Sequence, residues 1–264
     1  MTYTHGYASS VTTNHATRTV SDSAAYLLPH LGPGLRVLDV GCGPGSITLD
    51  LAEAVGPTGQ VVGIDVSEQV LDLARRAAAA RADTRTRWIR GDVGHLPVEP
   101  DSADVVHAHQ VLQHLTDPVG AIREMARVAR PGGLLALREV DMAATTWWPA
   151  SAGLSAWLEG YRTIAMGNGT TPDAGRRLLA WAHAAGLCDV EVSGSTWTYA
   201  DPARRRWLAT SWAERTRRTL LPQAERHGVD AGELEDAALA WRSWGEEPDG
   251  WFAFVHTEVL ARVT

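Results

Sequence analysis

Residues 37–46 read VLDVGCGPGS, an apolar strand that runs directly into a glycine-rich turn. From this turn onwards, apolar strands alternate with segments whose apolar residues recur at helical spacing. The predicted strands are 35–40, 60–65, 86–90, 103–108 and 134–140, and the predicted helices are 47–55, 68–81 and 119–130. Ser67 is a natural N-cap for the second of these helices. Strands that are apolar on both faces and alternate with helices are typical of a parallel, doubly wound α/β sheet.

The pattern changes after Asp141. Segments 189–199 and 251–263 alternate polar and apolar residues at period two, which predicts a terminal antiparallel pair. The helical predictions for this half are 145–168 (in part), 173–185 and 202–244. We therefore expect an N-terminal helical lid (1–30), a core domain (31–144, 171–200 and 250–264) and a helical cap (145–170 and 201–249).

The composition excludes several function classes. The chain has 264 residues and a net charge of −7, and all 24 basic residues are arginines. The absence of lysine rules out a P-loop with its phosphate-binding lysine, a pyridoxal Schiff base and any lysine nucleophile. Net acidity argues against nucleic-acid binding, and we expect the arginine run 204–206, with Arg215, Arg217 and Arg218, to lie on a solvated helix face.

Localisation follows from what the sequence lacks. No apolar run approaches the ~18 residues of a membrane span, so no membrane association is expected. The polar N-terminal segment has no signal-peptide pattern. Two cysteines cannot form a disulfide framework, and a cytoplasmic protein is therefore expected.

The glycine-rich turn is the first candidate for a ligand site, because open parallel sheets bind ligands beyond the carboxyl ends of their strands. Gly41 and Gly43 leave room for close approach of a ligand to the backbone. Asp65 ends the second strand, where it can accept both hydroxyls of a ribose, and Asp92 follows the third strand, where it can accept from an adenine amine. Each feature alone could be a tight turn or a helix cap, but together they predict an adenosine site. A dinucleotide fingerprint would have a third glycine where Ser46 stands, which disfavours an oxidoreductase.

These residues resemble the class I S-adenosylmethionine-dependent methyltransferases. The resemblance rests on 37–46, 62–65 (VGID), Gly91-Asp92, 104–115 (DVVHAHQVLQHL) and 124–135 (EMARVARPGGLL). It implies a seven-stranded, mostly parallel sheet with one antiparallel strand, S-adenosylmethionine as methyl donor, S-adenosylhomocysteine as product and a small-molecule acceptor. The expected cofactor-binding residues are Tyr7, Arg18, Asp39, Gly41, Cys42, Gly43, Asp65, Val66, Gly91, Asp92, Val93 and His109.

Three further stretches, 23–31 (SAAYLLPHL), 107–118 and 173–182 (DAGRRLLAWA), are similar to the dithiol S-methyltransferases. That group includes the gliotoxin bis-thiomethyltransferase and bacterial relatives that act on dithiolopyrrolones. The resemblance implies methylation of the thiols of a reduced dithiol natural product. The alternatives are O-, N- or C-methylation of another secondary metabolite or quinone, and, less favoured, a non-catalytic S-adenosylmethionine-binding protein.

Ten of the eleven tryptophans lie at or after residue 147, and we expect several of them to line a substrate cavity. The candidates for acceptor binding are His15, Trp147, Trp148, Trp157, Tyr161, Trp197 and Tyr199. Some of these aromatic residues are equally compatible with ordinary cap core. His109 and Gln110, just past the fourth strand, are the catalytic candidates, although they could simply position the substrate. A metal site is not expected, and the protein is expected to be a monomer or homodimer.

Overall fold

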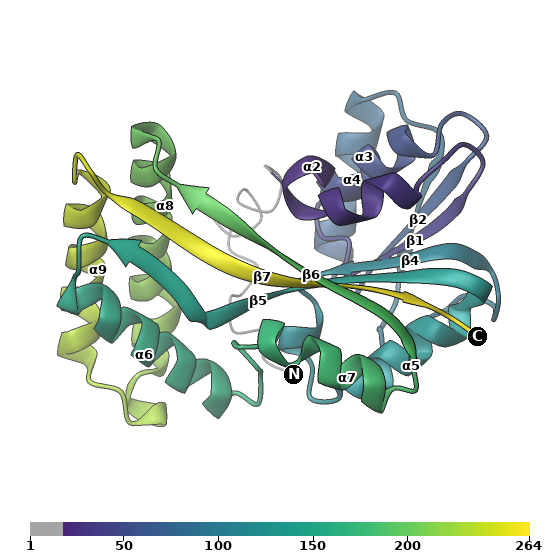
Figure 1. Cartoon of the computed structure of the whole chain (residues 1–264). Coiled ribbons are helices and arrows are strands. Elements are labelled where there is room, and N and C mark those ends of the chain that lie inside the picture. The colour runs from purple at the N-terminus through teal and green to yellow at the C-terminus, as the bar shows by residue number, and fades with distance from the viewer. Residues whose placement is uncertain (1–17) are drawn as a thin grey trace.

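A computed structural model describes residues 18–264, and its centre is one seven-stranded sheet (Figure 1). The strands are β1 (Arg36–Val40), β2 (Gln60–Asp65), β3 (Thr86–Arg90), β4 (Ala103–His109), β5 (Ala129–Trp148), β6 (Asp189–Tyr199) and β7 (Trp251–Arg262). Their order is β3-β2-β1-β4-β5-β7-β6. β1 to β5 pair in parallel, whereas β7 runs antiparallel to both β5 and β6. The predicted mostly parallel sheet with a terminal antiparallel pair is confirmed.

Helices cover both faces of the sheet. The core helices are α2 (Val20–Ser23), α3 (Ser46–Ala54), α4 (Glu68–Ala80), α5 (Pro118–Val128) and α7 (Leu178–Ala184). Figure 1 shows α2, α3 and α4 on one side of the strands and α5 and α7 on the other. Side chains alternate along each strand: Val37 packs in the cluster with α3, and Leu38 packs in the cluster with α5. As predicted, Ser67 caps α4, and its hydroxyl accepts the amide N–H of Val70.

The cap consists of α6 (Ala152–Gly167), α8 (Pro202–Arg215) and α9 (Ala231–Gly245). Figure 1 shows these helices at one end of the molecule, where β5, β6 and β7 project beyond the core helices. A separate aromatic core joins the cap helices to the strands. It includes Trp157, Trp212, Trp241, Trp244 and Phe252. Trp157 and Trp241 are fully buried and meet edge to face, with ring centroids 4.8 Å apart.

Three sequence-based expectations need correction. β5 does not end at residue 140: it continues to Trp148 beyond an irregularity after Asp141, because Thr146–Trp148 pair with β7. The segment predicted as one helix at 173–185 is a 3-10 turn (Gly175–Arg177) followed by the short α7. Arg205 does not lie on a solvated face; it is 3% exposed, and its guanidinium donates to the carbonyls of three chain segments, at Ala200, Gly245 and Gly250.

None of the helices in the described part of the chain is both long enough and apolar enough to cross a membrane.

Candidate functional site

The glycine-rich turn between β1 and α3 is shaped by three glycines in the left-handed region. Gly41, Gly43 and Gly45 have φ values of 68°, 56° and 82°. A Cβ on Gly41 would overlap Val111, and one on Gly45 would lie 2.5 Å from the Trp88 ring. A Cβ on Gly43 would meet no atom of residues 18–264 within 4 Å. Gly43 therefore leaves the backbone accessible just before the amino end of α3, and the amino end of a helix attracts polar and anionic ligand atoms.

Asp65 lies directly beside this turn. Its Oδ2 accepts the N–H of Gly43 at 3.1 Å, and its Oδ1 accepts the N–H of Ser67 at 2.9 Å. Burial raises the pKa of Asp65, an effect these backbone N–H groups oppose. Each carboxylate oxygen keeps a further lone pair for a ligand hydroxyl. The carboxylate and the turn are thus preorganised together, as the sequence predicts.

The other residues predicted to contact adenosine lie just after the neighbouring strands. Val66, just after β2, is 53% exposed, which is unusual for a valine bordering a core. Asp92 follows β3, the strand paired with β2, and its Oδ1 accepts the N–H of Gly94 at 2.8 Å. An exposed apolar side chain next to Asp65 offers a surface on which a flat ring could pack.

Asp39 and Cys42 lie on the buried side of the glycine-rich turn. Asp39 is buried, with one oxygen 2.7 Å from His107 Nδ1 and the other accepting the Thr48 hydroxyl at 2.5 Å. Cys42 is buried against the sheet, and burial raises the pKa of its thiol. These two residues shape the turn from its protein side.

Gln110, just after β4, has a strained backbone and an anchored side chain. Its φ is +55°, a conformation that non-glycine residues rarely adopt and that concentrates at functional sites. Its Oε1 accepts from Arg18 Nη2 at 2.9 Å, so its amide nitrogen donates to His256 Nε2, also at 2.9 Å. Burial lowers the pKa of His256 to about 2, and this neutral ring can accept that bond.

Glu139, on β5, forms hydrogen bonds with the loop that follows β4 and carries Gln110. One oxygen of its fully buried carboxyl accepts the N–H groups of Val111 at 2.8 Å and Leu112 at 2.6 Å. Its other oxygen has no hydrogen-bond partner among residues 18–264. Burial raises the pKa of Glu139 to about 8. Because Val111 contacts Gly41, this carboxyl joins the glycine-rich turn to the loop that carries Gln110.

Arg138, the preceding residue, is also fully buried. Its guanidinium pairs with Glu258 on β7 at 3.1 Å and donates to the Ser195 hydroxyl on β6 at 3.0 Å. It also lies 5.0 Å from the centroid of the Trp197 ring, as does the guanidinium of Arg18. The Trp197 indole N–H donates to the Asp22 carbonyl at 2.7 Å. The Trp197 side chain therefore contacts Arg138 of the sheet on one side and Arg18 and Asp22 of the N-terminal segment on the other.

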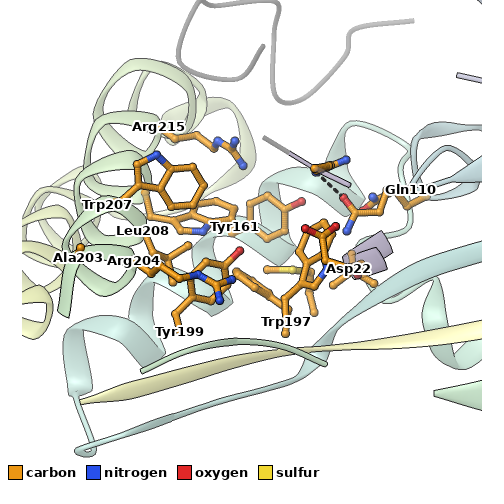
Figure 2. Close-up of a pocket in the computed structure, with 16 residues that line it drawn as sticks. Asp22, Gln110, Tyr161, Trp197, Tyr199, Ala203, Arg204, Trp207, Leu208 and Arg215 are labelled. Atoms are coloured by element: carbon orange, nitrogen blue, oxygen red, sulfur yellow. Dashed lines mark hydrogen bonds between the residues drawn. The ribbon is translucent and has the colours of Figure 1, made fainter. Parts of the chain in front are cut away.

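A cavity of about 620 Å³ opens where the cap meets these groups (Figure 2). Its described lining combines aromatic, aliphatic and charged side chains: Arg18, Asp22, Gln110, Gln113, Val140, Met142, Tyr161, Trp197, Tyr199, Ala203, Arg204, Trp207, Leu208, Trp212, Arg215 and Phe254. Figure 2 shows Gln110 and Trp197 towards one side of the cavity and Arg204 and Trp207 towards the other. The volume suits a small organic molecule.

The predicted acceptor-binding residues separate into three groups. Tyr161, Trp197 and Tyr199 line the cavity. Trp147, Trp148 and Trp157 are not among its described lining residues; Trp157 is buried in the cap core instead. His15 lies outside the described residues, as does Tyr7, which was predicted to bind the cofactor.

The catalytic candidates differ in their access to the cavity. Gln110 lines it, whereas His109 is buried behind Trp197, with ring centroids 5.5 Å apart. Burial and the nearby guanidinium of Arg18 lower the pKa of His109 well below its usual value. Within residues 18–264, no group of three His, Cys, Asp or Glu side chains is arranged to hold a metal ion.

Sequence reasoning missed Arg138, Glu139, Arg204 and His256. The adjacent charges Arg138-Glu139 inside an otherwise apolar strand (134–140, LLALREV) were an available signal. Charged residues are rarely buried unless they are paired, and two in succession at the carboxyl end of a core strand indicate a built polar site. His256 gave no comparable signal, because its partner Gln110 is 146 residues away.

Comparison with known proteins agrees with this geometry. An uncharacterized methyltransferase of Schizosaccharomyces pombe is 32% identical over 272 residues, covering 98% of this chain and 95% of that protein. The 27-O-demethylrifamycin SV methyltransferase of Amycolatopsis mediterranei is 34% identical, covering 92% of this chain and 85% of its own. The crystal structure of YcgJ from Bacillus subtilis shares the fold, with a TM-score of 0.59 at 17% identity over 91% of this chain and 97% of its own.

The fold and the glycine-rich site, taken with these relatives, define an S-adenosylmethionine-dependent methyltransferase. The family described as methyltransferase domain matches residues 31–186, and the chain belongs to that family.

Proposed function

We propose that the protein transfers a methyl group from S-adenosylmethionine to a thiol of a small molecule, most specifically a reduced dithiol natural product. The observation that carries the choice of acceptor is the charge of the cavity, which is lined by Arg18, Arg204 and Arg215 but by one described carboxylate, Asp22. A positive, partly desolvated cavity favours an acceptor that reacts as an anion. The sequence resemblance to dithiol S-methyltransferases supports the same choice.

The magnitude of the ionisation cost separates a thiol from a phenol. At pH 7, ionising a thiol of pKa about 8.5 costs about 2 kcal/mol, and ionising a phenol of pKa about 10 costs about 4 kcal/mol. A guanidinium a few ångströms away at a partly exposed site supplies a few kcal/mol at most. A guanidinium close to the sulfur can therefore bring a thiol to its reactive thiolate, whereas a phenol needs a general base as well.

The described residues offer little to act as that base. His256 and His109 are neutral, but both are buried, and Gln110 stands between His256 and the cavity. Burial also raises the pKa of Tyr199. A thiolate acceptor needs no general base. We therefore propose that Gln110 positions the acceptor and does not remove a proton from it.

For the cofactor, we propose that Gly41 and Gly43 bind the amino-acid portion, Asp65 the ribose hydroxyls, and Asp92 with Val66 and Val93 the adenine. When bound, S-adenosylmethionine supplies an electrophilic methyl group on sulfur. The chain aligns the acceptor in line with that methyl and excludes water from the cavity, which is how binding geometry lowers the barrier of such a displacement.

O-methylation is the second candidate. It is favoured by the relative named 27-O-demethylrifamycin SV methyltransferase, which is 34% identical over 92% of this chain. The same cationic cavity would hold a phenolate or enolate, provided that the acceptor is acidic enough to ionise without a base.

Toluene-3,4-dithiol and 4-methylcatechol share one skeleton and differ in the acceptor atom, so they separate the two candidates. Each is incubated with the protein and S-adenosylmethionine, and products are identified by mass spectrometry. The proposal expects methylated dithiol and stoichiometric S-adenosylhomocysteine, with little methylated catechol. Methylation of the catechol but not of the dithiol would overturn thiol specificity in favour of O-methylation.

A further inference from the structure

The arginine run at the start of α8 divides into three different environments. Arg205 is buried among backbone carbonyls. Arg206 is half exposed and faces Glu246 at 3.9 Å. Arg204 lines the cavity and lies over the Tyr199 ring, with its guanidinium carbon 5.1 Å from the ring centroid (Figure 2). Arg205 thus has a structural position, whereas Arg204 and Arg206 are both exposed, and of these two Arg204 is the one that lines the cavity.

The charge of Arg204 is not neutralised within residues 18–264, where no carboxylate forms an ion pair with it. Asp22, the acidic residue on the cavity wall, is engaged elsewhere. Its Oδ1 accepts from the Thr19 N–H at 3.1 Å and from the Ser23 hydroxyl at 2.5 Å. Stacking on Tyr199 restricts the guanidinium without using its N–H donors, which remain able to form a bidentate contact with an anion.

The cavity wall between the two ends of α8 is apolar. The residues of α8 that line it follow one helical stripe: Ala203, Arg204, Trp207, Leu208, Trp212 and Arg215. Arg204 and Arg215 are separated by eleven residues, which is about 16 Å along a helix. The guanidinium carbon of Arg204 lies 5.1 Å from the centroid of the Tyr199 ring, and that of Arg215 lies 4.4 Å from a ring centroid of Trp212. Figure 2 shows Arg204 on the side of the cavity away from Gln110.

We infer that Arg204 binds a carboxylate on the acceptor, remote from the atom that is methylated. The substrate class is then an elongated apolar molecule with a reacting thiol at one end and an acidic group at the other. This inference rests on the proposed function for the reacting atom, but carboxylate recognition can be measured without methyl transfer.

The test uses mercaptoundecanoate and its carboxamide, which differ in charge at the end remote from the thiol. Both are titrated into the S-adenosylhomocysteine-saturated protein by calorimetry, and both are assayed as methyl acceptors. The wild-type protein should bind the carboxylate roughly tenfold tighter than the carboxamide, as expected for one charge-assisted contact. Short mercaptopropionate cannot span the stripe and should show no such preference over its amide.

The variants are Arg204→Met and, as a control with the same charge change on the same helix, Arg206→Met. Arg204→Met should abolish the preference for the carboxylate, and Arg206→Met should retain it. Equal binding of the two ligands by the wild type, or equal preferences in both variants, would overturn the inference. If neither thiol is methylated while the carboxylate preference holds, the proposed thiol acceptor fails and the carboxylate site stands.

Discussion

Replacing Glu139 with glutamine should change how the stability of the protein depends on pH. Burial raises the pKa of this carboxyl from 4.5 to about 8, so the folded protein keeps a proton that the unfolded chain releases. A raised acid pKa contributes stability that is fully present below the unfolded pKa and is lost as pH rises through the folded pKa. Between about pH 5 and pH 8, each pH unit removes about 1.4 kcal/mol, or about 4 kcal/mol at most. Glutamine has no such titration, and its amide oxygen can still accept from Val111 and Leu112.

Urea unfolding of the wild type and Glu139→Gln at intervals across this pH range measures the effect. The wild-type free energy of unfolding should fall relative to that of the variant as pH rises. Glu124→Gln is the matched control, because Arg127 lowers the pKa of Glu124. The stability contributed by Glu124 is lost on acidification below its usual pKa, so this variant should track the wild type above pH 5. Parallel curves for the wild type and Glu139→Gln would refute the assignment of a buried, protonated carboxyl.

Three further changes test other parts of the molecule. Gly43→Ala and Gly228→Ala both place a Cβ at positive φ with no neighbouring atom of the described residues, so each should lower the free energy of unfolding by about 1 kcal/mol. Gly43→Ala alone should weaken S-adenosylmethionine binding, as measured by calorimetry. Equal affinities of the two variants would contradict a role for the glycine-rich turn in cofactor binding. Arg138→Met leaves the carboxylate of Glu258 buried and unpaired and should cost about 3–5 kcal/mol in urea unfolding, part of which a second change, Glu258→Gln, should restore. Trp157→Ala should cost about 3–5 kcal/mol with cofactor affinity unchanged, and a selective loss of acceptor binding in a stably folded variant would instead place Trp157 in the acceptor site.

The fold was largely predictable because its decisive signals are local. Strands β1, β2 and β4 each contain a short apolar run, and the turn at 41–45 that follows β1 needs its glycines. The end of β5 was not predictable, since residues 141–146 (DMAATT) have no clear alternation. That part of the strand is stabilised by pairing with β7, which lies more than a hundred residues away in the chain.

The candidate site likewise has residues that the sequence could predict and residues that it could not. Asp65 and Gly43 could be predicted together because each ends or follows a recognisable strand. The contact of Gln110 with His256, and that of Arg138 with Glu258, depend on how β7 inserts beside β5, which no local pattern specifies. Within the tryptophan-rich half, the sequence could not distinguish Trp197 in the cavity from Trp157 in the core. Both are aromatic residues in amphipathic segments, and only tertiary packing separates them.

A crystal structure of the complex with S-adenosylhomocysteine and a methylated dithiol would show where the cofactor and the acceptor bind. The ribose hydroxyls should lie on Asp65, the adenine between Val66 and Val93 with its amine on Asp92, and the homocysteine sulfur should face the cavity beside Gln110. The methylated sulfur should lie next to that thioether, in the space bounded by Trp197 and Tyr161. Adenosine bound away from Asp65, or a dithiol product bound outside this cavity, would refute the proposed site.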